Sequence, residues 1–148
     1  MAEMTGTKVN KELGSLPYED TYKIYIDALG FKNKPYIDVD GTSNISQDKI
    51  YNMLRLYGPC IVCYDSDENP RKRVGHVVIL RGVKKGATEN EAQYYIWDPD
   101  TGASVISGES LRKRINQDLG RQCSNSYSQQ CEQRNPGFIT APNAKFLL

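Results

Sequence analysis

Two stretches decide the fold of this chain: Val74-Gly75-His76-Val77-Val78-Ile79-Leu80-Arg81-Gly82-Val83 and Tyr94-Tyr95-Ile96-Trp97-Asp98-Pro99. Both are rich in β-branched and aromatic residues, which predicts two strands. The segment between them is polar and contains Gly86, so we expect it to turn the chain. A hairpin folded about Ala87 places His76 opposite Asp98, and residues directly opposite on antiparallel strands have Cβ atoms about 5 Å apart.

His76 and Asp98 are the candidate catalytic residues. His76 is the only histidine in the chain. An imidazole oriented by a carboxylate is half of a nucleophilic catalytic centre. Each residue alone also has a structural reading, because a lone histidine on a strand is often structural and an aspartate before a proline commonly ends a strand. The predicted register links the two and favours the catalytic reading.

The composition describes one ordinary globular domain, which we assign to residues 1–148. Hydrophobic residues make up 39% and charged residues 25%, as in average soluble domains. The net charge of +1 gives no strong field toward nucleic acid, so no nucleic-acid partner is expected. No apolar run approaches the ~20 residues of a membrane span. The N-terminus has no signal-peptide pattern, and we expect a cytoplasmic protein or one secreted without a visible signal peptide.

Apolar residues at helical spacing predict three helices. Each begins after a capping side chain and ends at a glycine. They run from Asp20 to Gly30, from Ser46 to Gly58 and from Ser107 to Gly120.

Strands are expected mainly between the second and third helices. The predicted ranges are 36–39, 60–64, 76–83, 92–98 and 103–106, with a further edge strand at 145–148. The remainder of 121–148 has no clear periodicity and is predicted to be irregular. Helices followed by a mostly antiparallel sheet indicate an α+β fold.

The four cysteines do not form a disulfide scaffold. Cys60 and Cys63 lie in a predicted strand and are interpreted as buried, inert thiols, since a redox Cys-x-x-Cys pair normally opens a helix. Cys123 and Cys131 are eight residues apart, which is unlike a zinc knuckle. No metal and no cofactor is expected, and a Cys123–Cys131 disulfide stays open for an exported protein.

Three segments together resemble a known family: Leu56–Val62 with its Gly-Pro helix end, Gly75–Val83 with its Gly-His strand, and Tyr95–Pro99 with its Asp-Pro strand end. This order is similar to the second half of papain-like cysteine peptidases. The likeness is greatest to the bacterial branch with bacteriocin-leader (C39-like) peptidases and AvrRpt2-type effector proteases. It implies a papain-like fold and a cysteine thiolate that attacks a peptide or isopeptide carbonyl. His76 would act as base and then acid, and Asp98 would fix its tautomer.

The chain departs from this family pattern at the nucleophile. The family places it at the start of a helix ahead of the aligned region, with an oxyanion-hole glutamine just before it. No cysteine precedes Cys60, and Gln47 is the first glutamine. Residues 1–7 look like the last turn of an apolar helix that closes on Gly6. We therefore expect the chain to begin just downstream of the catalytic cysteine, as a truncated or shortened form that is inactive as written.

Other readings stay open. Cys60 or Cys63 could replace the nucleophile, but this is disfavoured because a strand thiol lacks a helix N-terminus and burial raises its pKa. A second reading is a non-catalytic papain-like domain that binds peptides. A third is an interaction domain in which His76 and Asp98 are structural. The expected partner is a peptide or protein, and the sequence does not predict the oligomeric state.

Overall fold

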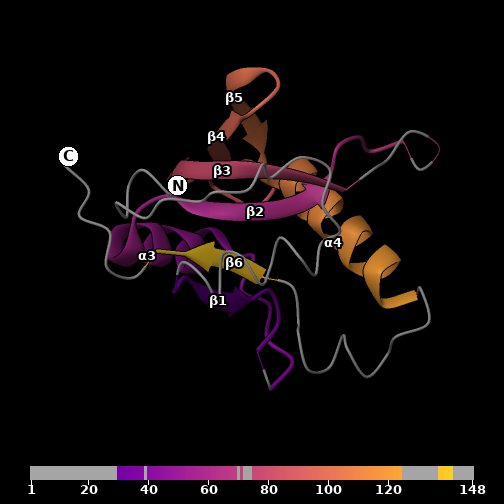
Figure 1. Cartoon of the computed structure of the whole chain (residues 1–148). Coiled ribbons are helices and arrows are strands. Elements are labelled where there is room, and N and C mark those ends of the chain that lie inside the picture. The colour runs from indigo at the N-terminus through magenta and orange to yellow at the C-terminus, as the bar shows by residue number, and fades with distance from the viewer. Residues whose placement is uncertain (1–29, 39, 70, 72–74, 125–136, 142–148) are drawn as a thin grey trace.

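The computed structural model describes residues 30–38, 40–69, 71, 75–124 and 137–141, with the side chains of 119–124 left aside. Six strands form one sheet in the order β1-β6-β2-β3-β4-β5, and all their pairings are antiparallel (Figure 1). The strands are β1 Lys32–Pro35, β2 Cys60–Asp65, β3 Gly75–Lys84, β4 Gln93–Asp98, β5 Gly102–Ser107 and β6 Gly137–Thr140, and the helices are α3 Gln47–Tyr57 and α4 Gly108–Ser124.

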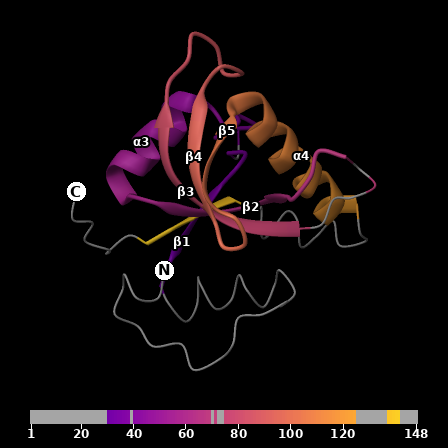
Figure 2. The same cartoon turned by 90° about the horizontal axis from the view of Figure 1, so that it is seen from above.

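Both helices cover the same face of the sheet, as Figure 2 shows. Strand side chains alternate between the two faces, and the residues that contact the helices have even numbers in β2, β3 and β4. The main core joins Ile50 and Met53 of α3 and Leu111 and Ile115 of α4 with these strand residues: Cys60, Val62, Tyr64, Val78, Leu80, Tyr94 and Ile96. A smaller cluster of Phe31, Ile61, Ile139 and Ala141 lies on the opposite face. The predicted α+β class is therefore confirmed for the described residues.

The predicted helix between Ser46 and Gly58 is confirmed as α3. The Ser46 side chain accepts a hydrogen bond from the backbone N–H of Lys49, as an N-cap does. Gly58 has a φ of 75°, and its N–H donates to the carbonyl of Leu54. A residue with a side chain is strained at this positive φ, so glycine ends the helix here.

The helix predicted after Ser107 is also present, but it ends later than expected. The hydroxyl of Ser107 accepts a hydrogen bond from the backbone N–H of Ser110 at 3.1 Å. The helix α4 then passes Gly120 and continues to Ser124. Glycine inside a helix costs only about 1 kcal/mol relative to alanine, so a single glycine does not have to end one.

Four of the predicted strands are confirmed as β2 to β5, whereas the strand predicted at 36–39 is wrong. The strand lies earlier, in β1, and Ile37 forms only an isolated bridge with Ser43. Here the chain makes a tight loop, in which the N–H of Asp38 donates to the carbonyl of Thr42. The alternating apolar and polar residues that predicted this strand therefore belong to the start of a turn, and not to a strand paired along its length.

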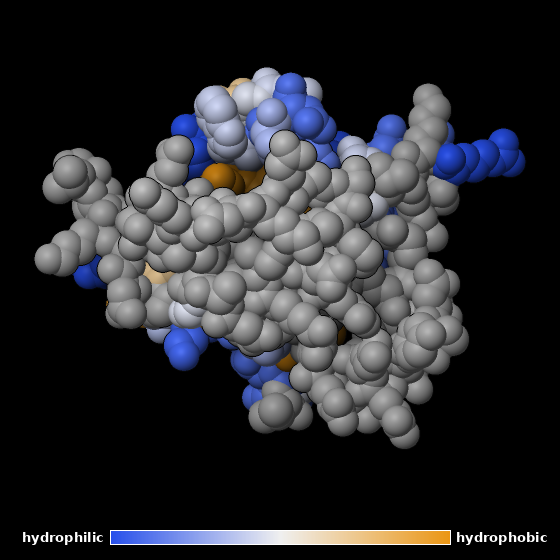
Figure 3. Space-filling view, viewed as in Figure 1, coloured by the Kyte–Doolittle hydropathy of each residue, from blue (hydrophilic) through white to orange (hydrophobic). Residues whose placement is uncertain are grey.

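The prediction that 121–148 is irregular is corrected by β6. This strand lies between β1 and β2, where it pairs with both. Residues 20–29 of the predicted first helix, the strand predicted at 145–148 and the interpretation of residues 1–7 fall outside the described residues; Gly30, the predicted end of that helix, has a φ of 69°. Among the described residues, no helix is long and apolar enough to cross a membrane. The described surface at the top of Figure 3, over the β4–β5 end, is mostly hydrophilic.

Candidate active site

The structure brings His76 and Asp98 together. His76 is the second residue of β3, and Asp98 is the last residue of β4. Nε2 of His76 and Oδ2 of Asp98 lie 2.8 Å apart. The two side chains are 20% and 13% exposed, so the pair is shielded from water and still reachable from the surface.

The contact arises through a register that differs from the predicted one. The observed pairing sets Ile79 opposite Trp97, so Asp98 is offset by two positions from His76 rather than directly opposite. A β-bulge between Leu80 and Gly82 shifts the ladder, and the sequence does not reveal it. Diagonal neighbours on a sheet are about 7–8 Å apart, within reach of longer side chains. The imidazole and the carboxylate close that gap.

Backbone amides hold the second oxygen of Asp98. Its Oδ1 accepts hydrogen bonds from the N–H groups of Asp100, at 2.8 Å, and Thr101, at 3.3 Å. Burial alone would raise the pKa of Asp98. The bonds from Asp100 and His76 outweigh burial, and the pKa of this carboxyl lies below its ordinary value. Asp98 is therefore a fixed carboxylate at neutral pH.

An aromatic ring forms one wall beside His76. Tyr64 of β2 is directly opposite His76 in the ladder. The two rings stack with centroids 6.2 Å apart and planes inclined by 22°. The guanidinium of Arg114, from α4, lies over the Tyr64 ring at 5.4 Å and also donates to the carbonyl of Ser66. Burial raises the pKa of Tyr64, so the phenol stays neutral.

The hydrogen bond to Asp98 selects one tautomer of His76. A carboxylate accepts, so Nε2 must carry the proton and the neutral ring keeps its lone pair on Nδ1. Within the described residues, Nδ1 has no hydrogen-bond partner. The basic atom of the neutral ring is therefore Nδ1.

The same pair could also contribute ligands to a cation. Donor atoms of His76, Asp98 and Asp100 lie within 4.8 Å of one another. However, both oxygens of Asp98 already accept hydrogen bonds from His76 and from backbone amides. A cation would have to displace these bonds, so the arrangement favours the imidazole–carboxylate pair.

The described thiols do not lie beside His76. Cys60 is opposite Leu80 and Cys63 is opposite Val77, while Tyr64 takes the place across from His76. Both thiols are free and buried. Burial raises the pKa of Cys60 strongly and that of Cys63 to about 12. Neither forms a thiolate at neutral pH. The side chain of Cys123 and all of Cys131 fall outside the description.

A family model described as papain-like cysteine protease AvrRpt2 matches residues 16–114, two thirds of the chain. The chain belongs to this papain-like cysteine protease family. No curated protein and no solved structure matched it. The family match confirms the papain-like resemblance and includes both His76 and Asp98. The likeness to bacteriocin-leader peptidases stays a prediction.

The sequence predicts the contact between His76 and Asp98, which the structure shows, but it does not predict the residues that surround the pair. Tyr64 directly follows Cys63 in β2 and lies opposite His76 in the ladder, and the sequence marks it only as an aromatic strand residue. The Asp98-Pro99-Asp100 run is a turn signal, and it points to the backbone amides that bind Oδ1. Arg114 comes from a helix far along the chain, and no local pattern identifies it.

The ionised state of Asp98 gives a pH-dependent prediction. Because its folded pKa is lowered, its contribution to stability is complete above the unfolded pKa of about 3.9 and is lost as the pH falls through the folded pKa. At pH 6 we expect Asp98→Asn to be less stable than the unsubstituted protein by about 1.5–3 kcal/mol, the range for hydrogen bonds to charged groups.

Urea unfolding from pH 6 down to pH 3 measures this difference, which should shrink below about pH 4. The matched control is Asp100→Asn, an exposed neighbour whose backbone N–H is retained. It should change stability by less than about 0.5 kcal/mol. A difference for Asp98→Asn that stays constant over the whole range would contradict an ionised, stabilising carboxylate.

Proposed function

We propose that this domain hydrolyses peptide or isopeptide bonds through a cysteine thiolate, with His76 as general base and Asp98 as its orienting acid. One observation carries the proposal: Asp98 occupies Nε2 of His76 at 2.8 Å, and Nδ1 has no partner among the described residues. A histidine held in this way has one defined basic atom, as nucleophile activation requires. Membership of a papain-like protease family supports the same reaction.

The chemistry follows from the tautomer. Nδ1 takes the thiol proton, and the thiolate sulfur attacks the substrate carbonyl carbon. The imidazolium returns the proton to the leaving nitrogen as the C–N bond breaks, and water then hydrolyses the thioester. Asp98 stays ionised and stabilises the imidazolium. The stacked ring of Tyr64 limits rotation of the imidazole, which keeps Nδ1 aimed in one direction.

We further propose that the nucleophile is a cysteine encoded N-terminal to Met1, and that the 148-residue chain by itself is inactive. The high pKa values of Cys60 and Cys63 support this part, because a protonated thiol is a poor nucleophile. On this proposal the chain alone retains a peptide-binding surface and lacks thiol catalysis.

A peptidyl vinyl sulfone, which alkylates activated thiols, tests both parts. The probe is added to the 148-residue chain and to a form extended by the codons upstream of Met1, and the labelled cysteine is identified by mass spectrometry. We expect no label on Cys60 or Cys63 in either form. We expect label on an upstream cysteine in the extended form, and loss of this label in His76→Ala.

Each other outcome is decisive. Label on Cys60 or Cys63 that depends on His76 would overturn the upstream nucleophile and keep the His76–Asp98 pair. His76-dependent label on Cys123 or Cys131 would have the same meaning. An upstream region without a cysteine would also overturn the proposal of an upstream nucleophile. Labelling that is unchanged in His76→Ala would overturn the role of His76 itself, and the domain would then be a non-catalytic relative.

A further inference from the structure

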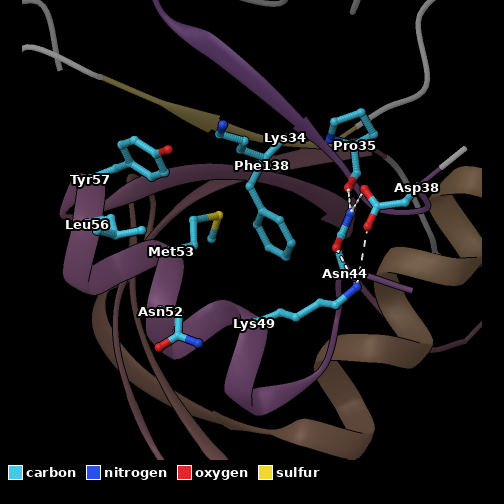
Figure 4. A pocket seen from close by; sticks show the side chains of 10 residues that line it. All are labelled: Lys34, Pro35, Asp38, Asn44, Lys49, Asn52, Met53, Leu56, Tyr57 and Phe138. Atoms are coloured by element: carbon cyan, nitrogen blue, oxygen red, sulfur yellow. Dashed lines mark hydrogen bonds and ion pairs between the residues drawn. The ribbon is translucent and has the colours of Figure 1, made fainter. Parts of the chain in front are cut away.

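A pocket separate from the His76–Asp98 pair lies between α3, β1 and β6. Its volume is about 370 Å³, within the usual range for small-molecule sites. Figure 4 shows its ten lining residues. They are Lys34, Pro35, Asp38, Asn44, Lys49, Asn52, Met53, Leu56, Tyr57 and Phe138.

The floor of the pocket is apolar. Phe138 and Met53 are buried in the main core, and the Phe138 ring is fixed by edge-on contact with Tyr36, at 4.9 Å between centroids. Leu56 also lines the pocket, although this residue is 73% exposed. An apolar ligand group placed here would remove leucine surface from water, which is favourable by about 25 cal/mol per Å².

One end of the pocket is polar and already satisfied. Asn44 donates to the carboxylate of Asp38 and to the carbonyl of Pro35, both at 2.7 Å. Lys49 donates to Asn44 at 3.0 Å and pairs with Asp38 at 3.4 Å. The dashed lines in Figure 4 join these groups. The charges cancel, so this end offers no strong site for an ion.

Lys34 is different, because it carries a positive charge that no described carboxylate neutralises. Its Nζ lies over the Tyr57 ring at 4.8 Å from the centroid. A second tyrosine of α3, Tyr51, has a similar contact, because the Nζ of Lys85 lies 4.6 Å from its ring centroid. There the Lys85 amine also forms an ion pair with Asp48 at 2.7 Å. Within the described residues, no acid lies within ion-pair distance of Lys34. Among the described residues, the Lys34–Tyr57 pair therefore has no carboxylate in the place that Asp48 takes beside Lys85.

We propose that this pocket binds a carboxylic acid bearing one apolar group of the size of a phenyl or leucyl side chain. The carboxylate pairs with Lys34, as Asp48 does with Lys85, and the apolar group lies against Met53, Leu56 and Phe138. A free acid and the C-terminus of a peptide share this chemistry. The pocket contains neither His76 nor Asp98, so the proposal does not depend on peptidase activity.

Titration with 3-phenylpropionate tests the site, followed by NMR of the Met53 methyl group and the backbone amides. The uncharged control ligand is 3-phenylpropionamide. We expect saturable shifts at Met53 and Leu56 with the acid, and about twofold to fivefold weaker binding of the amide, as an exposed ion pair predicts. Lys34→Gln should weaken binding of the acid by the same factor, while Lys85→Gln should leave it unchanged.

A second pair of ligands distinguishes the two sources of the carboxylate. N-acetylphenylalanine binding more tightly than 3-phenylpropionate assigns the site to peptide C-termini, and the reverse order assigns it to free acids. Equal binding of acid and amide would overturn the proposal. So would the absence of saturation, or equal losses in Lys34→Gln and Lys85→Gln. None of these results bears on vinyl sulfone labelling, so the two proposals fail separately.

Discussion

Replacing Tyr36 with alanine should lower the free energy of unfolding by about 3–5 kcal/mol, the range for removing a buried aromatic ring. Tyr36 is fully buried and follows β1 directly. Its hydroxyl donates to the carbonyl of Cys63 on β2 at 2.9 Å. Its ring packs edge-on against Phe138 of β6. One side chain thus ties three strands together, and alanine would leave a cavity between them.

Urea denaturation followed by circular dichroism measures the loss caused by Tyr36→Ala. The matched control is Tyr36→Phe, which keeps the ring and removes only the hydroxyl. It should cost about 0.5–1.5 kcal/mol, a typical net value for one hydrogen bond. A loss below about 1 kcal/mol for the alanine variant would mean that the core closes around the cavity. Tyr36 would then not be the link between these strands.

Replacing Gly108 with valine should be comparably damaging, for the opposite reason. Gly108 is buried at the start of α4, and its N–H donates to the carbonyl of Ala92 at 2.7 Å. A Cβ atom at this position would overlap the backbone carbonyl of Glu89. The Glu89 side chain in turn accepts a hydrogen bond from the N–H of Gln47 at the start of α3, at 2.7 Å. A side chain at 108 therefore pushes on a segment that holds both helices.

We expect Gly108→Ala to cost about 1–3 kcal/mol and Gly108→Val more, since backbone cannot move aside as a flexible side chain can. The control is Asn116→Ala, an exposed position on the same helix, which should change stability by less than about 0.5 kcal/mol. Thermal and urea unfolding of the three variants provide the comparison. Gly108→Val as stable as Asn116→Ala would show that the helices do not depend on this close approach.

The elements that sequence predicts well are those with local signals. The helix α3 lies between a capping serine and a Gly-Pro stop, and β2 to β5 form a meander whose partners are neighbours along the chain. The strands β1 and β6 have only four residues each, and they pair across a long separation, with Lys32 opposite Thr140. Their identity as strands depends on tertiary pairing that no local pattern records.

The candidate site shows the same division. The pairing of His76 with Asp98 was predicted from two adjacent strands, and the contact is present although the register differs by two positions. The hairpin limits the possible partners of His76 to a few residues. The imidazole and carboxylate side chains are long enough to meet although the strand register differs from the predicted one. The position of Arg114 over Tyr64 depends on how α4 crosses the sheet. The way α4 crosses the sheet follows from packing in the main core, and this packing cannot be predicted from the spacing of residues along the chain.

The position of β6 between β1 and β2 has a consequence for synthesis on the ribosome. Strands β1 and β2 do not touch along a ladder; each pairs with β6, which is made last among the described elements. The β2–β5 meander can form as it emerges, since its contacts are local. The edges of β1 and β2 must wait for residues 137–140 before they are covered. Until then the nascent chain exposes unpaired strand edges, the kind of surface that chaperones protect.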